Sequence, residues 1–248
     1  MAGPASEAVA YGQELTAAVR EVLGGALVSA CLHGSGAMGG WAAGRSDVDL
    51  LFVTDRALEP GEIARLSTAV NALPCPGSGV EMSVVRGPLE LPPGHPPFEA
   101  HITTGADPKV VSGAGHAGDA DLILHFAVAR ARGLPLFGPP LAGVLPEVPR
   151  ARVLAALEEE LAWAETDAPA HYAVLNGCRA AAFAETDTLL SKLEGAAWAK
   201  EARFHPGIAA AAARRQQAST GPELPPGAVR AVIADARARI ARALEREA

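Results

Sequence analysis

The chain has 248 residues, of which 49% are hydrophobic and 20% charged, which is enough for a folded core and unlike a disordered chain. Its net charge of −7 gives no general attraction to nucleic acids or anionic lipid. Three widely spaced cysteines, Cys31, Cys75 and Cys178, predict neither a disulfide framework nor a zinc site. The sequence opens without a signal-peptide pattern, and no apolar run approaches the roughly 18 residues needed to cross a bilayer. We therefore expect a cytoplasmic protein without a membrane or nucleic-acid partner.

The first half of the sequence is typical of a mixed α/β domain. Apolar residues at helical spacing between 15 and 23 end at a glycine pair, and a strand is expected over 26–32. A glycine-rich segment over 33–45 then predicts a loop. Further strands are expected over 47–53 and 79–85, with a helix at 61–72 between them.

Two proline-rich segments, 88–97 and 135–149, interrupt the middle of the chain, and a helix is expected between them over 121–130. The second segment is the predicted domain boundary. Beyond it only helical patterns occur, at 152–163, 172–183, 191–200 and 229–244. We predict an α/β N-terminal domain over 1–149, built as a mixed sheet with helices, and an all-α C-terminal domain over 150–248.

Two carboxylates alternate with apolar residues along the second expected strand. Because residues i and i+2 of a strand face the same side, Asp47 and Asp49 should project together while Val48 and Leu50 point into the core. Like charges this close repel, and a cation with oxygen ligands relieves the repulsion. Mg²⁺ is commonly held by one or two carboxylates together with substrate phosphates. The pattern predicts a site for a magnesium-bound nucleotide.

Two further features favour such a site. Glu81 alternates with apolar residues in the next expected strand, where it could serve as a base or as a third ligand. Gly34 and Ser35 directly follow the first strand, where bare backbone N–H groups and a hydroxyl can cradle a phosphate. Each motif alone is weak, because surface acids and glycine-rich loops are common. Together, in this order and spacing, they indicate phosphoryl or nucleotidyl transfer.

The segments His33-Gly34-Ser35 and Arg45-Ser46-Asp47-Val48-Asp49-Leu50-Leu51 resemble the signature of the DNA polymerase β-like nucleotidyltransferases. Within that superfamily, residues 15–198 look like the aminoglycoside adenylyltransferases that modify streptomycin or spectinomycin. Members of that family join such a domain to a helical C-terminal domain. The resemblance implies transfer of AMP from ATP to a hydroxyl of an aminoglycoside, with release of pyrophosphate.

The same resemblance assigns roles to the motif residues. Asp47 and Asp49 would hold two Mg²⁺ ions. Glu81 would be the base that takes the proton from the acceptor hydroxyl. Ser35 and Ser46, with the backbone at Gly34, would contact the triphosphate of ATP.

The helical domain offers further candidate contacts to the nucleotide. Tyr172, Asn176 and Arg179 are spaced i, i+4 and i+7, so they form one polar stripe on a helix. Ser191 begins an S-x-x-E capping box, which places Lys192 in the first turn of a helix, where an anion is favoured. A surface lysine after a helix cap is the plain alternative. The resemblance favours phosphate binding, because an arginine and a lysine from matching family segments reach the ATP phosphates.

A polycationic acceptor favours carboxylates in its pocket, since these form charge-assisted hydrogen bonds with ammonium groups. Glu165 and Asp167, just before the Tyr172 helix, are candidates, although acids there can also cap a helix. Glu99 and His101 fall where the family lines its acceptor pocket, and Tyr172 is a further candidate. His101 stands near the position where we expect a tryptophan in streptomycin-modifying members.

The other histidines and aromatic residues predict structure rather than chemistry. His116 and His125 lack the spacing of a metal site and are interpreted as structural. Trp163, Phe183 and Trp198 are expected in the core.

The sequence leaves the acceptor open. The same chemistry could place a nucleotidyl group on a protein side chain or another small alcohol, and a non-catalytic nucleotide-binding or antitoxin-like protein could keep the fold. The three carboxylates argue against the last of these, because a binding module needs no base. The leading prediction is a monomeric enzyme with ATP and a cationic small molecule as substrates, bound in a cleft between its domains.

Overall fold

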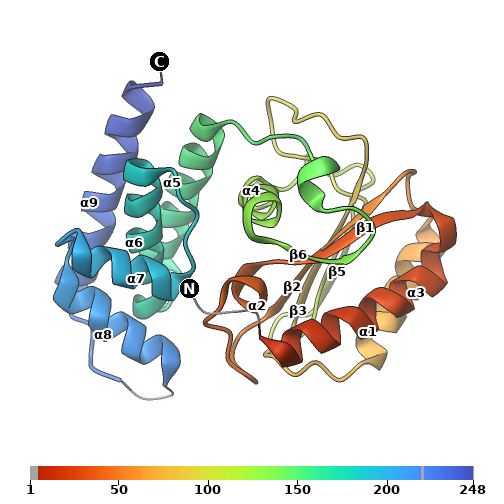
Figure 1. Cartoon of the computed structure of the whole chain (residues 1–248), viewed down its shortest axis with the longest axis horizontal. Coiled ribbons are helices and arrows are strands. Elements are labelled where there is room, and N and C mark those ends of the chain that lie inside the picture. Colours follow the sequence, from red (N-terminus) through yellow and green to blue (C-terminus); the bar gives the residue numbers. More distant parts are fainter. Residues whose placement is uncertain (1–4, 219–220, 248) are drawn as a thin grey trace. The chain divides into compact units, whose positions relative to one another are not determined.

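The computed structural model describes residues 5–218 and 221–247, which form two compact units (Figure 1). The units meet along the sequence between Val148 and Pro149, at the end of the second proline-rich segment. No helix in the described part of the chain combines the length and hydropathy that a membrane span requires.

The N-terminal unit contains a six-stranded mixed sheet in the order β5-β4-β3-β2-β1-β6. Strands β2 and β3 pair in parallel, whereas the other four ladders are antiparallel. A parallel pair needs a crossover, which helix α3 (Pro60–Ala72) supplies. The strands are β1 (Leu27–Leu32), β2 (Val48–Thr54), β3 (Val80–Arg86), β4 (Ala100–Thr103), β5 (Lys109–Ser112) and β6 (Leu134–Phe137).

Apolar cores lie on both faces of this sheet. Helices α1 (Ser6–Leu23) and α3 cover one face, and α4 (Leu122–Arg132) covers the other (Figure 1). Alternation along β2 divides its side chains between the two cores. Leu50 packs with α1 and α3, whereas Leu51 packs with Phe126 of α4. The remaining elements are the short helix α2 (Gly34–Met38) and two single 3₁₀ turns, Gly24–Ala26 and Leu141–Gly143.

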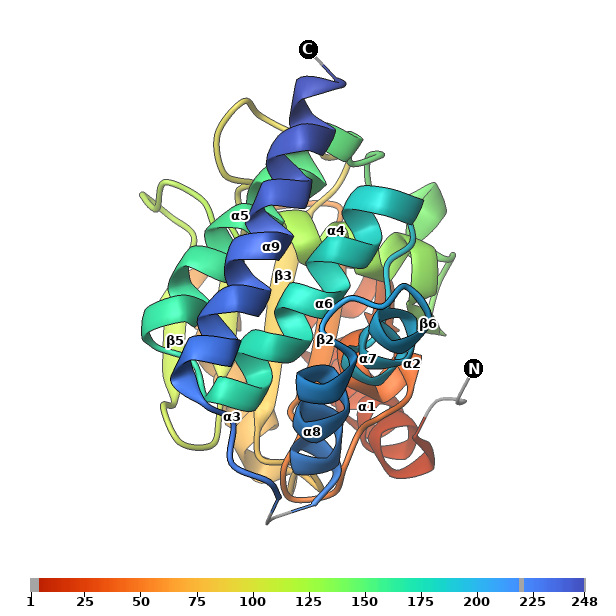
Figure 2. The same cartoon turned by 90° about the vertical axis from the view of Figure 1, so that its left-hand side faces the viewer.

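The described part of the C-terminal unit consists of helices and connecting loops. Helix α6 is the central helix, because it packs against each of the other four and almost every residue from Ala173 to Ala184 is buried. Figure 2, which faces this unit, shows α5, α6 and α9 running side by side. The helices are α5 (Arg150–Thr166), α6 (Ala170–Thr186), α7 (Lys192–Glu201), α8 (Pro206–Gln217) and α9 (Pro226–Glu245).

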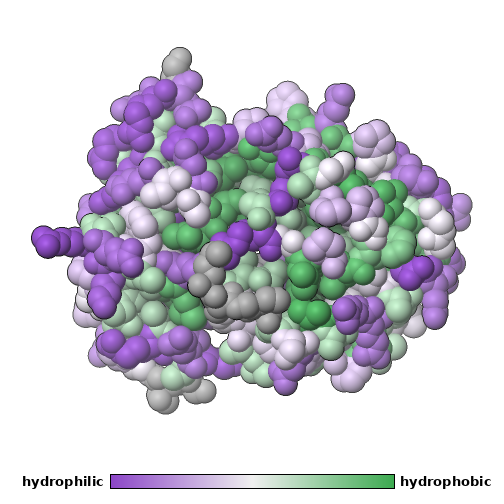
Figure 3. All heavy atoms as spheres, viewed as in Figure 1, coloured by the Kyte–Doolittle hydropathy of each residue, from purple (hydrophilic) through white to green (hydrophobic). Residues whose placement is uncertain are grey.

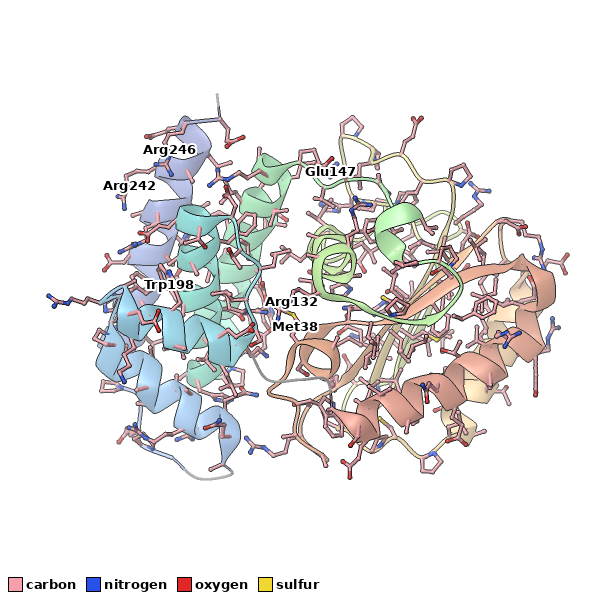
Figure 4. All side chains as sticks on the ribbon, in the orientation of Figure 1. Met38, Arg132, Glu147, Trp198, Arg242 and Arg246 are labelled. Atoms are coloured by element: carbon pink, nitrogen blue, oxygen red, sulfur yellow. The ribbon has the colours of Figure 1, made fainter. Side chains whose placement is uncertain are left out.

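Polar side chains gather on one side of helix α9 in the C-terminal unit. Hydrophilic residues cover the end of α9 in the space-filling view (Figure 3), where Arg242 and Arg246 project outward (Figure 4). The opposite stripe of α9, which includes Val232, Ile233 and Ile240, is buried. The amphipathic pattern of the sequence therefore orients this helix.

The mixed α/β class is confirmed, and several details of the prediction are wrong. The segment over 33–45 is not only a loop, because it contains helix α2. The four-residue strands β4, β5 and β6 and the helix α8 were not predicted. The strands are too short for a clear alternation, and α8 is so rich in alanine that its apolar period is faint.

The three aromatic side chains expected in the core differ in how deeply they are buried. Phe183 is buried. Trp198 is half-buried and packs against Phe204 with ring centroids 5.7 Å apart. Trp163 is 49% exposed, so its assignment to the core was wrong. It meets the ring of Tyr172 edge to face at 5.7 Å.

Close packing of α6 against α9 predicts a cost for any side chain at Gly177. A Cβ there would lie 2.8 Å from Cγ1 of Val232, closer than carbon atoms pack. Overpacking outweighs the helix propensity gained, so Gly177→Ala should lower the free energy of unfolding by about 1 kcal/mol. Urea denaturation measures the loss. In a double-mutant cycle with Val232→Ala, losses that simply add would contradict this contact as the cause.

Candidate active site

Two carboxylates lie side by side on the sheet face that α4 covers. In the parallel ladder of β2 and β3, Asp49 is directly paired with Glu81. The flanking residues Leu50 and Met82 are fully buried in the opposite core, which fixes the face that the acids occupy. Neighbouring strands are about 4.8 Å apart, so two ionised groups here repel each other unless a cation lies nearby.

Asp47 precedes β2 and is held by the surrounding loops. Its Oδ1 accepts a hydrogen bond of 2.8 Å from the Ser78 hydroxyl, and its backbone carbonyl accepts one of 3.1 Å from the Trp41 indole N–H. Ser78 lies just before β3, so both parallel strands contribute to the position of this acid.

The backbone at the end of β1 lies against Asp49. The His33 N–H donates to the Asp49 carbonyl at 2.9 Å. Gly34 has a φ of +56°, and a Cβ at this position would lie 1.9 Å from Oδ2 of Asp49. Only glycine fits here, because any side chain would occupy the place of the carboxylate and would also strain the backbone.

The two serines predicted to bind phosphate lie in different surroundings. Ser35 is in the first turn of α2, where its carbonyl accepts a hydrogen bond from Gly39 N–H at 3.1 Å. The Ser46 hydroxyl accepts a hydrogen bond of 3.1 Å from Ala42 N–H and so closes a local turn. Their role toward a triphosphate stays a prediction.

His125, which the sequence analysis interprets as structural, lies beside the paired carboxylates. This side chain of α4 places Nε2 3.6 Å from Oε1 of Glu81. Its ring packs against that of His33 with centroids 5.0 Å apart. A lone histidine in an apolar helix gave no sign of this contact, which joins residues 44 positions apart in the sequence.

The pKa values of the two histidines are displaced in opposite directions. Burial, together with the nearby His125, holds the pKa of His33 well below its usual value. Burial also lowers the pKa of His125, but the neighbouring carboxylates, Glu81 and Asp49 foremost, outweigh it and raise that pKa. His33 is therefore the neutral member of the pair, and His125 is the one favoured to carry a charge.

Of the acceptor candidates Glu99, just before β4, and His101, within it, His101 shares the carboxylate face. His101 pairs with Ser83 across β3 and β4, with Nδ1 and the serine Oγ 3.0 Å apart. Glu99 is engaged elsewhere, because its carboxylate accepts a hydrogen bond from Leu58 N–H at 3.0 Å and lies 3.7 Å from Arg86 Nε. His116 packs against Phe98 with centroids 4.9 Å apart, as its structural interpretation predicts.

A second polar cluster lies within the C-terminal unit and brings the predicted stripe of α6 together. One oxygen of Glu160, Oε1, is 3.2 Å from the Tyr172 hydroxyl, 2.7 Å from Asn176 Nδ2 and 3.5 Å from Arg179 Nη2. Arg179 also donates to Asn176 Oδ1. Burial raises the pKa of Tyr172, and the Glu160 carboxylate adds to the rise. The sequence did not single out Glu160, because it is one of three consecutive glutamates.

The predicted capping box at the start of α7 is confirmed. Ser191 N–H donates to Glu194 Oε2 at 2.8 Å, and Glu194 N–H donates to Ser191 Oγ at 3.3 Å. Lys192 is thus the first residue of the helix, and its Nζ lies 3.8 Å from the centroid of the Tyr172 ring. This cation–π contact joins Lys192 to the Glu160 cluster.

The two acids predicted near the start of α6 have partners within their own unit. Glu165 lies 3.2 Å from Nη1 of Arg237, which also binds Glu158 at 2.7 Å. Asp167 caps the C-terminal end of α5 and accepts a hydrogen bond from Thr166 Oγ1. Neither side chain belongs to the Glu160 cluster.

The described residues contain no group of three or more histidine, cysteine or acidic side chains arranged to hold a metal by themselves. Asp47 and Asp49 nevertheless suit Mg²⁺, which takes oxygen ligands and often only one or two carboxylates besides substrate phosphates. Glycine at position 34 leaves open the space beside Oδ2 of Asp49 that a Cβ would fill.

Comparison with known proteins finds a similar family for the C-terminal part of the chain. Residues 143–239 match the family described as aminoglycoside adenylyltransferase, C-terminal domain. The match confirms the predicted resemblance to aminoglycoside adenylyltransferases and, with it, the enzyme class of nucleotidyltransferase.

A solved structure shares the fold of most of the chain. It is the spectinomycin adenyltransferase AAD(9) from Enterococcus faecialis, crystallised with ATP and spectinomycin. The two chains are 19% identical and superpose with a TM-score of 0.70 over 93% of this chain and 99% of the other. A search of curated protein sequences finds no significant match.

The close approach of Gly34 to Asp49 can be tested against a matched glycine. Gly44 also has a positive φ, +68°, but a Cβ there meets no atom within 4 Å. Gly44→Ala should therefore lose only the backbone preference, about 1 kcal/mol of unfolding free energy. Gly34→Ala should lose about 1–3 kcal/mol more, because the Asp49 carboxylate must move. Equal losses in urea denaturation would show that Asp49 does not confine this position.

Proposed function

We propose that the protein transfers AMP from ATP to a hydroxyl of an aminoglycoside of the streptomycin or spectinomycin type, with release of pyrophosphate. The observation that carries the proposal is the pairing of Asp49 with Glu81 beside the glycine turn at Gly34. The family of residues 143–239 supports the substrate class. The structural neighbour, which was solved with ATP and spectinomycin, supports both substrates.

In this proposal the N-terminal unit carries the chemistry. Glu81 accepts the proton of the acceptor hydroxyl as the hydroxyl oxygen attacks the α-phosphorus of ATP. The bond from that phosphorus to the bridging oxygen breaks, and pyrophosphate leaves. Asp47 and Asp49 would hold two Mg²⁺ ions, which when bound offset the negative charge of the phosphates. The backbone at Gly34 and the hydroxyls of Ser35 and Ser46 orient the triphosphate.

The helical unit contributes cations in the same proposal. Arg179 and Lys192 bind the nucleotide phosphates, and each already has a partner that limits its rotamers. Glu160 and Asn176 fix the guanidinium of Arg179, and the Tyr172 ring supports Lys192. Such pre-arranged charges stabilise a transition state with little reorganisation.

The residues proposed to contact the acceptor are ranked by where each side chain lies and by whether it already has a partner. His101 is the favoured contact, because it lies on the sheet face of Glu81. Tyr172 is a second one. Glu99, Glu165 and Asp167 would have to exchange their present partners for the ammonium groups of the drug. The enzyme is proposed to act as a monomer in the cytoplasm.

A pyrophosphate-release assay tests the proposed reaction. Wild-type protein with Mg²⁺ and ATP is offered streptomycin, spectinomycin, other aminoglycosides or no acceptor, and Asp47→Asn serves as the control for contaminating activity. We expect release that depends on one drug, and a product that is heavier by one AMP unit. Release only with another alcohol or a protein would reassign the acceptor. Binding of ATP without release in any case would contradict the proposal.

If Glu81 is the base, its substitution should lower kcat and leave the affinity for Mg²⁺-ATP unchanged. Glu81→Gln keeps the size of the side chain and removes the base, so kcat should fall by about 100-fold or more. The affinity for Mg²⁺-ATP, measured by isothermal titration calorimetry, should stay within about twofold of wild type, because a base toward the acceptor does not hold the nucleotide. A large loss of affinity would instead make Glu81 a metal ligand.

A further inference from the structure

His125 lies where α4 crosses the paired carboxylates. The Nε2–Glu81 distance of 3.6 Å is the closest charged approach to that carboxylate given by the described residues. The imidazole is only 20% exposed, and the Glu81 side chain is 31% exposed. The base therefore has one side open to solvent and the other side against a largely buried ring.

The surroundings of the ring determine which nitrogen carries hydrogen. Nδ1 of His125 is buried and has no hydrogen-bond partner among the described residues. Nothing there draws a hydrogen to Nδ1, whereas Nε2 faces a carboxylate. Both the neutral Nε2–H tautomer and the cation thus present an N–H to Glu81.

An N–H donor beside Glu81 offsets the repulsion between this carboxylate and its neighbour. Its neighbour across the parallel ladder is Asp49, so repulsion between the two carboxylates pushes the half-exposed side chain toward solvent. An N–H donor 3.6 Å from Oε1 of Glu81 counteracts that push. The titratable groups that face His125 are Glu81 from β3, Asp49 from β2, His33 at the end of β1, and Asp119 and Asp121 before α4.

We propose that His125 is a positioning residue for the base: its Nε2–H holds the Glu81 carboxylate in the orientation that receives the proton of the acceptor hydroxyl. The inference rests on the proposed function and adds to it a residue from outside the sequence motifs. His125 does not touch the substrates in this scheme, and acts through Glu81 alone.

The variant His125→Leu removes the N–H and keeps a side chain of similar bulk at this position of α4. We expect kcat with the acceptor drug to fall by about 10- to 100-fold, because a misplaced group costs rate rather than binding. The dissociation constant for Mg²⁺-ATP should not change. His125→Gln can place an amide N–H near the position of Nε2, and it should recover most of the lost rate. A purely structural role would not give this rescue.

Two further variants separate positioning from general damage. Since His125 acts through Glu81, adding His125→Leu to Glu81→Gln should lower kcat no further than Glu81→Gln alone. His116→Leu is the matched control, because that ring contacts Phe98 in the same unit and no carboxylate. It should leave kcat unchanged. Independent, multiplicative losses in the double variant would overturn the inference.

Nitrogen NMR of the histidine rings tests the contact without any turnover. We expect the Nε2 resonance of His125 to shift in Glu81→Gln and the resonances of His116 to stay in place. Unchanged His125 resonances would overturn the inference even if His125→Leu fails to fold. If wild type turns over and His125→Leu has the same kcat, the role of His125 is overturned and the proposed function stands. Absence of turnover by wild type with every acceptor would overturn the proposed function and the catalytic role of His125 with it.

Discussion

The candidate active site depends on the register of one parallel strand pair. Asp49 and Glu81 are neighbours only because β2 and β3 pair without a shift from Val48 to Thr54. A shift of one residue in β3 would move Glu81 into the core under α1 and α3 and turn Val80 and Met82 to the face of Asp49. Burial of those apolar residues under α1 and α3 therefore enforces the position of an acid on the opposite face. The hydrophobic packing of one face sets the chemistry of the other.

The groups around Asp47, Asp49 and Glu81 affect these carboxylates in different ways. Glycine at position 34 lets backbone approach Asp49 without a side chain, and Ser78 donates a hydrogen bond to Asp47. Burial lowers the pKa of His33, whereas the nearby carboxylates raise the pKa of His125, the ring that lies beside Glu81. A charge in a buried site is favoured only beside a partner of opposite sign, so the acids favour the protonated form of His125 over that of His33.

Local sequence patterns predicted the parts of the site that one element determines. The alternation around Asp47, Asp49 and Glu81 and the capping box at Ser191 each need only the residues of a single strand or helix turn. His125 and Glu160 could not be predicted in this way. His125 meets Glu81 only after α4 folds onto the sheet, and the packing of α5 on α6 selects Glu160 from three adjacent glutamates. Such contacts depend on tertiary packing, which one sequence does not encode in any short spacing.

In the C-terminal unit, too, a charged side chain is held in place by a residue on a neighbouring helix. There a single carboxylate oxygen of Glu160 contacts a hydroxyl, an amide and a guanidinium, so an acid holds the arginine that the proposal assigns to phosphate binding. In the N-terminal unit the proposed arrangement is the reverse, because the imidazole of His125 would hold the carboxylate of Glu81. In both places the organising residue lies on a helix outside the family motifs, while the organised residue lies within them. A substitution at either organising residue should therefore change the orientation of Glu81 or Arg179 while leaving these two residues themselves unaltered.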